Sequence, residues 1–119
     1  MKQTIAIFFT LLFCLGGINN AMADNAPPSQ DEIGHLVINY YNNQGEWAGV
    51  FRIGTIERIK IEQRNPVQMI AHVRYDYIPI PGNYKGRTDT GHDQRAFFLI
   101  RNDHRWQVVR MGKYMSAQF

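Results

Sequence analysis

The sequence predicts an α+β fold, in which one N-terminal helix packs on a curved four-stranded antiparallel sheet. Three observations support this: a capped amphipathic segment that begins at Ser29, four β-rich segments that follow it, and short polar turns between the first and second and between the third and fourth of them. The helix has one apolar stripe and must bury it against another element, and the sheet is the only candidate. Residues 29–119 are therefore predicted to form a single domain.

The predicted helix begins with Ser29-Gln30-Asp31-Glu32. This sequence matches a capping box, in which the serine oxygen accepts from a free amide and the glutamate reaches back. Asn42, Asn43 and Gly45 then end the helix. The apolar positions fall on one helical face at spacings of three and four; they are Ile33, Leu36, Val37, Tyr40 and Tyr41.

The first two strands are predicted over Val50–Arg64 and Val67–Ile80, joined at Asn65-Pro66. Ile56 is out of phase with the apolar residues on either side, which indicates a β-bulge near Gly54-Thr55. The second strand alternates cleanly, because successive side chains in a strand point to opposite faces. One face has Val67, Met69, Ala71, Val73, Tyr75 and Tyr77; the other has Gln68, His72, Arg74 and Asp76.

The last two strands are predicted over Gln94–Arg101 and Arg105–Met111, with a turn at 102–104. They are apolar on both faces, and the helix can cover only one. We therefore expect the outer sheet face to be covered by a second copy of the chain, giving a homodimer. The alternative is that this face serves a different partner, such as a cell-envelope protein.

The N-terminus has the features of a signal peptide over residues 1–23, with cleavage after Ala23. Lys2 is followed by the apolar run Ile5–Leu15 and by a small-x-small motif at 21–23. A retained anchor is the alternative, although even the longer run from Ile5 to Ile18, with 14 residues, is shorter than the roughly 20 that a membrane span needs. A lipoprotein signal is excluded because Phe13 precedes Cys14. We expect a periplasmic or secreted protein without a stable membrane span after cleavage.

Removing 23 of the 119 residues leaves 96, of which residues 24–28 read as a linker. This mature part has no cysteine, so disulfides are excluded and an apolar core must hold the domain together. Its basic and acidic residues alternate along the chain without runs of one sign. That pattern argues against nucleic acid as a partner.

The closing hairpin, Arg95–Ile100 followed by Arg105–Met111, resembles the final strands of NTF2-like proteins, where Trp-x-Val follows a tight turn. The arrangement over about residues 29–112 resembles the cystatin-like, or NTF2-like, α+β roll in a minimal version with one helix. Cystatin-type protease inhibition is disfavoured, because Met111 replaces the glycine of Gln-x-Val-x-Gly and the segment lies in the last strand.

The roll resemblance implies two functional alternatives. Ketosteroid-isomerase-like relatives use a carboxylate base in an inner cone, a role that Asp76 would fill with His72 as its partner. Some periplasmic components of secretion apparatus also use this roll. A solvated strand face with cross-strand ion pairs is the simpler interpretation of His72, Arg74 and Asp76.

Further ligand-binding candidates are Arg74, Trp47, Asp89, His92 and Asp93, the last three in a predicted connection over residues 79–93. Its single histidine and loose spacing predict no metal site, and nothing in the sequence predicts a cofactor. A polar hairpin tip explains the same residues. The leading hypothesis is a non-enzymatic binding or assembly module of the cell envelope that acts through its sheet.

Overall fold

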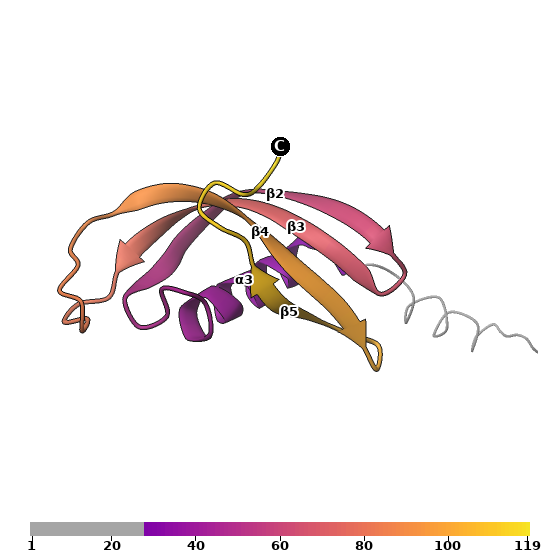
Figure 1. The fold of residues 1–119 in the computed structure, drawn as a ribbon, viewed down its shortest axis with the longest axis horizontal. Coiled ribbons are helices and arrows are strands. Elements are labelled where there is room, and N and C mark those ends of the chain that lie inside the picture. Colours follow the sequence, from indigo (N-terminus) through magenta and orange to yellow (C-terminus); the bar gives the residue numbers. More distant parts are fainter. Residues whose placement is uncertain (1–27) are drawn as a thin grey trace, which may run out of the picture.

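The computed structural model describes residues 28–119. The predicted signal peptide over 1–23, and all but the last residue of the predicted linker over 24–28, lie outside the described residues. The elements are α3 (Gln30–Asn43), β2 (Phe51–Asn65), β3 (Gln68–Pro79), β4 (Gly91–Asn102) and β5 (Arg105–Met111). All neighbouring strands are antiparallel, and their order in the sheet follows the sequence. The sheet arches over the helix (Figure 1), so the predicted α+β class is confirmed.

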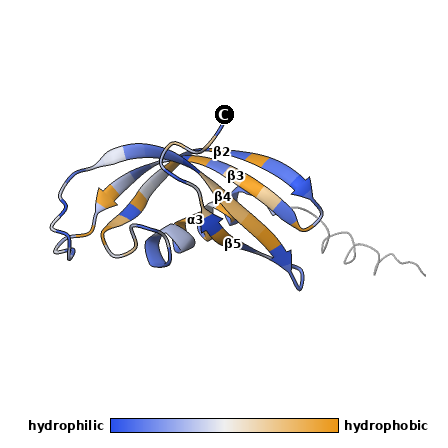
Figure 2. Cartoon of the chain, viewed as in Figure 1, coloured by the Kyte–Doolittle hydropathy of each residue, from blue (hydrophilic) through white to orange (hydrophobic). Residues whose placement is uncertain are grey.

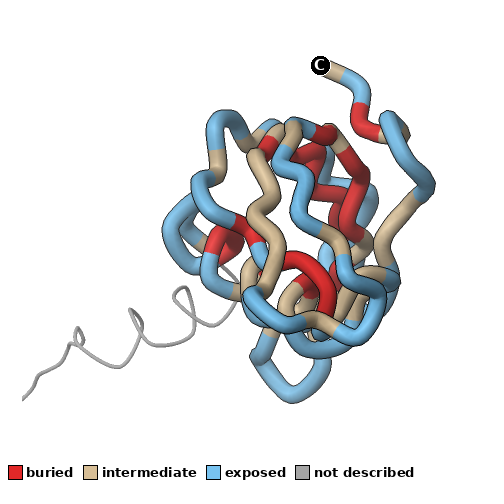
Figure 3. The backbone as a smooth tube through the Cα atoms, turned by 90° about the vertical axis from the view of Figure 1, so that its left-hand side faces the viewer, coloured by how far each residue is buried: buried red, intermediate tan, exposed pale blue. Residues whose placement is uncertain are grey.

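The capping box at the start of α3 is present in both directions. Ser29 Oγ accepts from the Glu32 amide at 3.1 Å, and Glu32 Oε1 accepts from the Ser29 amide at 2.9 Å. Behind this cap, Ile33, Val37 and Tyr41 are buried against the sheet. The helix packs more extensively on β2 than on β5. Figure 3 shows the buried segments in the middle of the molecule and exposed turns around them.

The bulge in β2 lies where the phase of Ile56 predicts it. Ile53 pairs with Tyr77 and Ile56 with Tyr75, so β2 has one extra residue between these pairs. The Thr55 amide turns to Asp76 and donates to its Oδ1 at 2.6 Å. A Cβ on Gly54 would lie 2.6 Å from the same Oδ1. The bulge therefore needs glycine at position 54.

The connection between β3 and β4 is shorter than predicted. Pairing continues through Tyr75↔Asp93 and Asp76↔His92 to Tyr77↔Gly91, so β4 begins three residues before Gln94. His92 and Asp93 are therefore strand residues, and the predicted loop over 79–93 is wrong at its C-terminal end. The polar side chains of these residues hid the strand from a pattern based on hydrophobicity.

The helix covers the face of β3 that carries Met69, Ala71, Val73 and Tyr75, all buried in the core. Hydrophobic residues dominate the second half of β4, whereas the ends of β2 and β4 and the turns that follow them are hydrophilic (Figure 2). The opposite, outer face is partly covered by the C-terminal segment, residues 112–119, which we call the strap. In Figure 1 it crosses to the side of the sheet away from α3. The premise that nothing else in the chain covers this face is therefore wrong, and the homodimer stays a prediction.

Candidate functional site

His72, Arg74 and Asp76 lie on the outer face, because their neighbours Val73 and Tyr75 point into the core beneath the helix. They do not line an inner cone between helix and sheet. The Asp76 carboxylate accepts a hydrogen bond from the Thr55 amide in the β2 bulge. An acid–base role for Asp76 and His72 stays a prediction, and it would have to operate on the outer face.

His72 is 5% exposed and is held on both ring nitrogens. Nδ1 accepts from the backbone amide of Gln118 at 3.1 Å, and Nε2 lies 3.0 Å from Glu62 Oε1. The hydrogen bond with His72 is the main cause that lowers the pKa of Glu62. Arg74 donates from Nε to Gln94 Oε1 at 3.2 Å. The strap therefore contacts the outer face at His72 through the Gln118 amide.

The three candidates from the predicted loop, Asp89, His92 and Asp93, do not form one site. Asp89 forms a two-pronged ion pair with Arg87, at 2.9 and 2.8 Å, which lowers the pKa of Asp89. His92 Nδ1 lies 2.8 Å from Glu57 Oε2. Asp93 is buried on the inner face. Within residues 28–119, no three His, Cys, Asp or Glu side chains gather as a metal site would require.

Asp93 and Trp47 do come together, in a cavity of about 320 Å³ on the inner face near the end of α3. We call it the aromatic cavity. Trp47 and Tyr77 pack edge to face on Phe51, with ring centroids 5.3 and 4.8 Å away. The volume is at the lower end for small-molecule sites. The lining residues are Tyr41, Glu46, Trp47, Phe51, Tyr77, Arg87, Asp93, Arg95 and Tyr114.

A buried ion pair closes this cavity. Asp93 Oδ2 accepts from Arg95 Nε at 2.6 Å and from the Tyr75 hydroxyl at 3.2 Å. Arg95 also donates to Glu46 Oε1 at 2.9 Å. Burial alone would lower the pKa of Arg95, but the hydrogen bonds to Asp93 and Glu46 outweigh it and raise the pKa. Arg95 is buried on the inner face opposite Val73, so it cannot pair with Asp76 on the outer face.

The tyrosines beside the ion pair are harder to ionise than usual. Burial raises the pKa of Tyr41 to about 12. Burial, together with the nearby Tyr41 and Asp93, raises the pKa of Tyr75 further. Three groups of this cluster have a raised pKa, which lies further above pH 7 than usual: Tyr41, Tyr75 and Arg95. They keep their protons near pH 7, which suits a structural or binding role.

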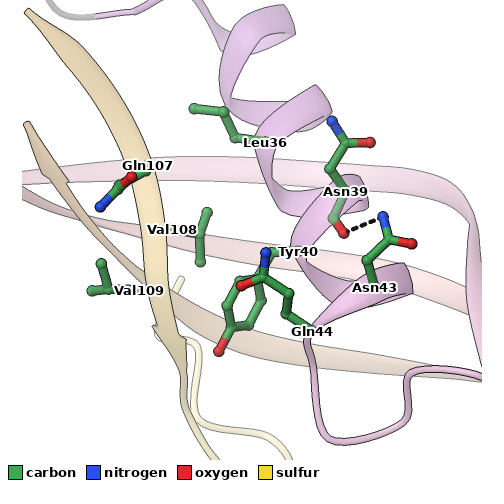
Figure 4. A pocket seen from close by; sticks show the side chains of 8 residues that line it. All are labelled: Leu36, Asn39, Tyr40, Asn43, Gln44, Gln107, Val108 and Val109. Atoms are coloured by element: carbon green, nitrogen blue, oxygen red, sulfur yellow. Dashed lines mark hydrogen bonds between the residues drawn. The ribbon is translucent and has the colours of Figure 1, made fainter.

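A second concavity lies between α3 and β5, with a volume of about 770 Å³ (Figure 4). We call it the amide groove, because four of its eight lining residues are Asn or Gln. Asn43 Nδ2 donates to the backbone carbonyl of Asn39 at 2.9 Å. No lining residue is charged. The lining consists of Leu36, Asn39, Tyr40, Asn43, Gln44, Gln107, Val108 and Val109.

The sequence did not identify this groove. The spacing of Asn39, Asn43 and Gln44 beside the apolar stripe indicates a polar helix side. The groove itself, however, depends on the position of the helix over the sheet, which the sequence pattern does not give. Comparison with protein family models, with curated proteins and with solved structures gave no match. Within the part of the chain that the structure describes, no helix has the length and apolar character needed to cross a membrane.

Proposed function

We propose that this chain is an exported, non-enzymatic binding or assembly module of the cell envelope, which binds an extended segment of a partner protein along β5. This proposal rests on the position of β5, which is one of the two edge strands of the sheet and the one that borders the amide groove. Among the described strands, β5 pairs only with β4. Half of its backbone N–H and C=O groups therefore face away from the sheet.

An extended peptide satisfies these backbone groups by adding a fifth strand, a recurring mode of peptide recognition. On its other side, the peptide would face Asn39 and Asn43 of α3 and the C-cap residue Gln44. Amide side chains both donate and accept, so they can bond to a peptide backbone in either direction. The uncharged lining favours a segment that is itself uncharged where it enters the groove.

The same lining argues against catalysis in the groove. It contains no carboxylate, imidazole, thiol, lysine or serine. These are the side chains that most often act as general acids, bases or nucleophiles. Leu36, Val108 and Val109 instead provide apolar contacts for the side chains of a bound strand.

The partner class follows from the predicted export signal over 1–23, which directs the chain to the periplasm or outside the cell. A helix on the concave face of a four-stranded antiparallel sheet is compatible with a minimal cystatin-like or NTF2-like roll. In that setting the bound segment belongs to an envelope protein. A secretion apparatus is one such assembly.

The aromatic cavity favours a second candidate function, the binding of a small aromatic molecule. Trp47, Phe51 and Tyr77 give it stacking surfaces, and Arg87 lies over the rings of Trp47 and Phe51 at 5.4 and 5.2 Å. Aromatic walls with a few polar groups are typical of small-ligand sites.

The peptide proposal is tested by selecting linear nine-residue peptides from a phage-displayed library on purified residues 24–119. Selected peptides are titrated into ¹⁵N-labelled protein. We expect chemical-shift changes in Arg105–Met111 and in the C-terminal half of α3. Asn39→Trp fills the groove from an exposed helix position and is expected to weaken binding at least tenfold.

His35→Trp is the matched control. His35 lies one helical turn before Asn39, is also exposed, and lines the opposite groove between α3 and β2. It is expected to leave peptide affinity unchanged. Peptides that map to the outer face, equal affinity of the two variants, or a stable dimer paired through β5 would each contradict the proposal.

A further inference from the structure

The strap makes an unusually specific set of contacts for a chain segment without helix or strand. It begins where β5 ends, and β5 is five residues shorter than its partner β4. The uncovered edge of β4 is taken over by the strap: the Gly112 amide donates to Ala96 O at 2.7 Å, and the Ala117 amide donates to Gln94 O at 3.2 Å. In return, the Ala96 amide donates to Ser116 Oγ at 3.0 Å.

Beyond Ala117 the strap turns onto the outer face. The Phe119 ring lies against two guanidinium groups, with the Cζ atoms of Arg58 and Arg74 at 4.8 and 5.0 Å from its centroid. Its edge meets the His72 ring at a centroid distance of 6.5 Å. Both distances are within the ranges for cation–π and edge-to-face contacts. Arg58, Arg74 and His72 thus form an aromatic-docking site, which Phe119 occupies.

A further contact of the strap, at His72, links its docking to a proton. The donor at His72 Nδ1 is the backbone amide of Gln118, whose N–H cannot act as an acceptor. Nδ1 must therefore be unprotonated when the strap is docked, and Nε2 carries the hydrogen that faces Glu62. A proton and the Gln118 N–H compete for one lone pair.

We propose that residues 112–119 are a releasable strap on the aromatic-docking site, and that protonation of His72 releases its end. The docked state binds one proton fewer at Nδ1, so docking is favoured at higher pH and lost as the pH falls.

The other charges around His72 belong to the sheet. Glu62 and Lys60 lie on β2, with Lys60 directly opposite His72 in the register, and Arg58 and Arg74 lie on either side of Phe119. On β4 the outer-face neighbours are Ala96 and Gln94, which are uncharged. The pairing of His72 with Glu62 does not involve the strap and persists when the strap leaves. The sheet charges surround His72 in both states, whereas the hydrogen bond from the Gln118 amide exists only when the strap is docked. This hydrogen bond therefore links the protonation of His72 to docking.

The inference is independent of peptide binding at β5, because the strap docks on β2, β3 and β4. The test is an NMR titration of residues 24–119 from about pH 8 to about pH 5, the range in which histidine changes charge. We expect the amide signals of the strap from Ser116 onward to change with the His72 imidazole. Their heteronuclear NOEs are expected to fall at acid pH, while those of the Val73 and Leu99 amides in the sheet stay constant.

Two variants at one position separate the amide donor from the side chain. Gln118→Pro removes the N–H, whereas Gln118→Ala keeps it. The Gln118 N–H competes with the proton for His72 Nδ1, so the His72 imidazole of Gln118→Pro is expected to become protonated at a higher pH than that of Gln118→Ala.

His72→Gln is expected to make the order of the strap independent of pH. The proposal is overturned if the proline and alanine variants titrate alike. It is also overturned if the strap signals do not follow His72, or if acid still releases the strap in His72→Gln.

Discussion

Replacing Asp93 by asparagine tests the buried ion pair at the aromatic cavity. The side chain keeps its size but loses the charge that faces Arg95, a residue only 4% exposed. The remaining partner, Glu46, has a side chain that is 61% exposed and compensates less. Removing one member of a buried pair costs about 3–5 kcal/mol, because the other charge is left uncompensated. We expect the lower end, about 3 kcal/mol, since an asparagine oxygen can still accept.

That loss is a large share of the roughly 5–15 kcal/mol that stabilises a domain. At about 4–8 °C for each kcal/mol, it lowers the melting temperature by about 12–24 °C. Urea unfolding followed by tryptophan fluorescence measures the free energy directly. Asp89→Asn is the control, because its pair with Arg87 is exposed on both sides, and its unfolding midpoint is expected to stay unchanged. A loss below about 1 kcal/mol in Asp93→Asn would show that water already solvates Arg95.

Three further predictions concern the helix, the bulge and the tyrosines. Ser29→Ala removes the capping box and is expected to cost about 1 kcal/mol in urea unfolding; an unchanged midpoint would show that the cap is frayed. Gly54→Ala brings a Cβ to 2.5 Å from Ile78 Cδ1 and is expected to cost about 1–3 kcal/mol, whereas Gly34→Ala, with its nearest atom at 3.5 Å, is expected to stabilise the helix by about 0.5–1 kcal/mol. Equal effects of these two alanines would contradict the bulge geometry. Because burial raises the pKa of Tyr41 to about 12, and that of Tyr75 still further, folding keeps protons that the unfolded chain releases near pH 10. The contribution of these two tyrosines to stability is therefore expected to be constant below about pH 10 and to fall from there towards pH 12. Absorbance at 295 nm should show these two tyrosines ionising only with unfolding, and early ionisation of all tyrosines would oppose this.

Local features of the fold were predictable because local residues determine them. The capping box depends on Ser29 and Glu32, which are three positions apart. The bulge followed from the phase of Ile56 alone. The face of β3 that carries Tyr75 was predicted from strict alternation, and the helix covers that face.

The start of β4 was missed because none of Gly91, His92 and Asp93 is hydrophobic, although Asp93 occupies an inner-face position. Hydrophobic alternation cannot recognise such a position, since the charge of Asp93 is tolerated there only because it pairs with Arg95. Trp47 and Asp93 were candidates from the sequence, but their meeting in one cavity depends on contacts between distant segments.

Neither the position of the strap nor the amide groove could be predicted from the sequence, because both depend on contacts between distant segments. Residues 112–119 have no periodic pattern, and their place is fixed by the edge of β4 that β5 leaves uncovered. The groove exists because α3 packs more extensively on β2 than on β5. Both features depend on the lengths of the strands and on the position of the helix over the sheet. The pattern of hydrophobic and polar residues does not determine either of these.

The central claim is that β5 receives a partner strand, and amide hydrogen exchange on β5 tests it most directly. Exchange rates are measured for Arg105–Met111 with and without a selected peptide. Because alternate residues of an edge strand direct their amides outward, we expect protection to rise at alternate positions and to be lost in Asn39→Trp. Unchanged exchange along β5, with protection appearing instead on the strap or on β2, would contradict the claim.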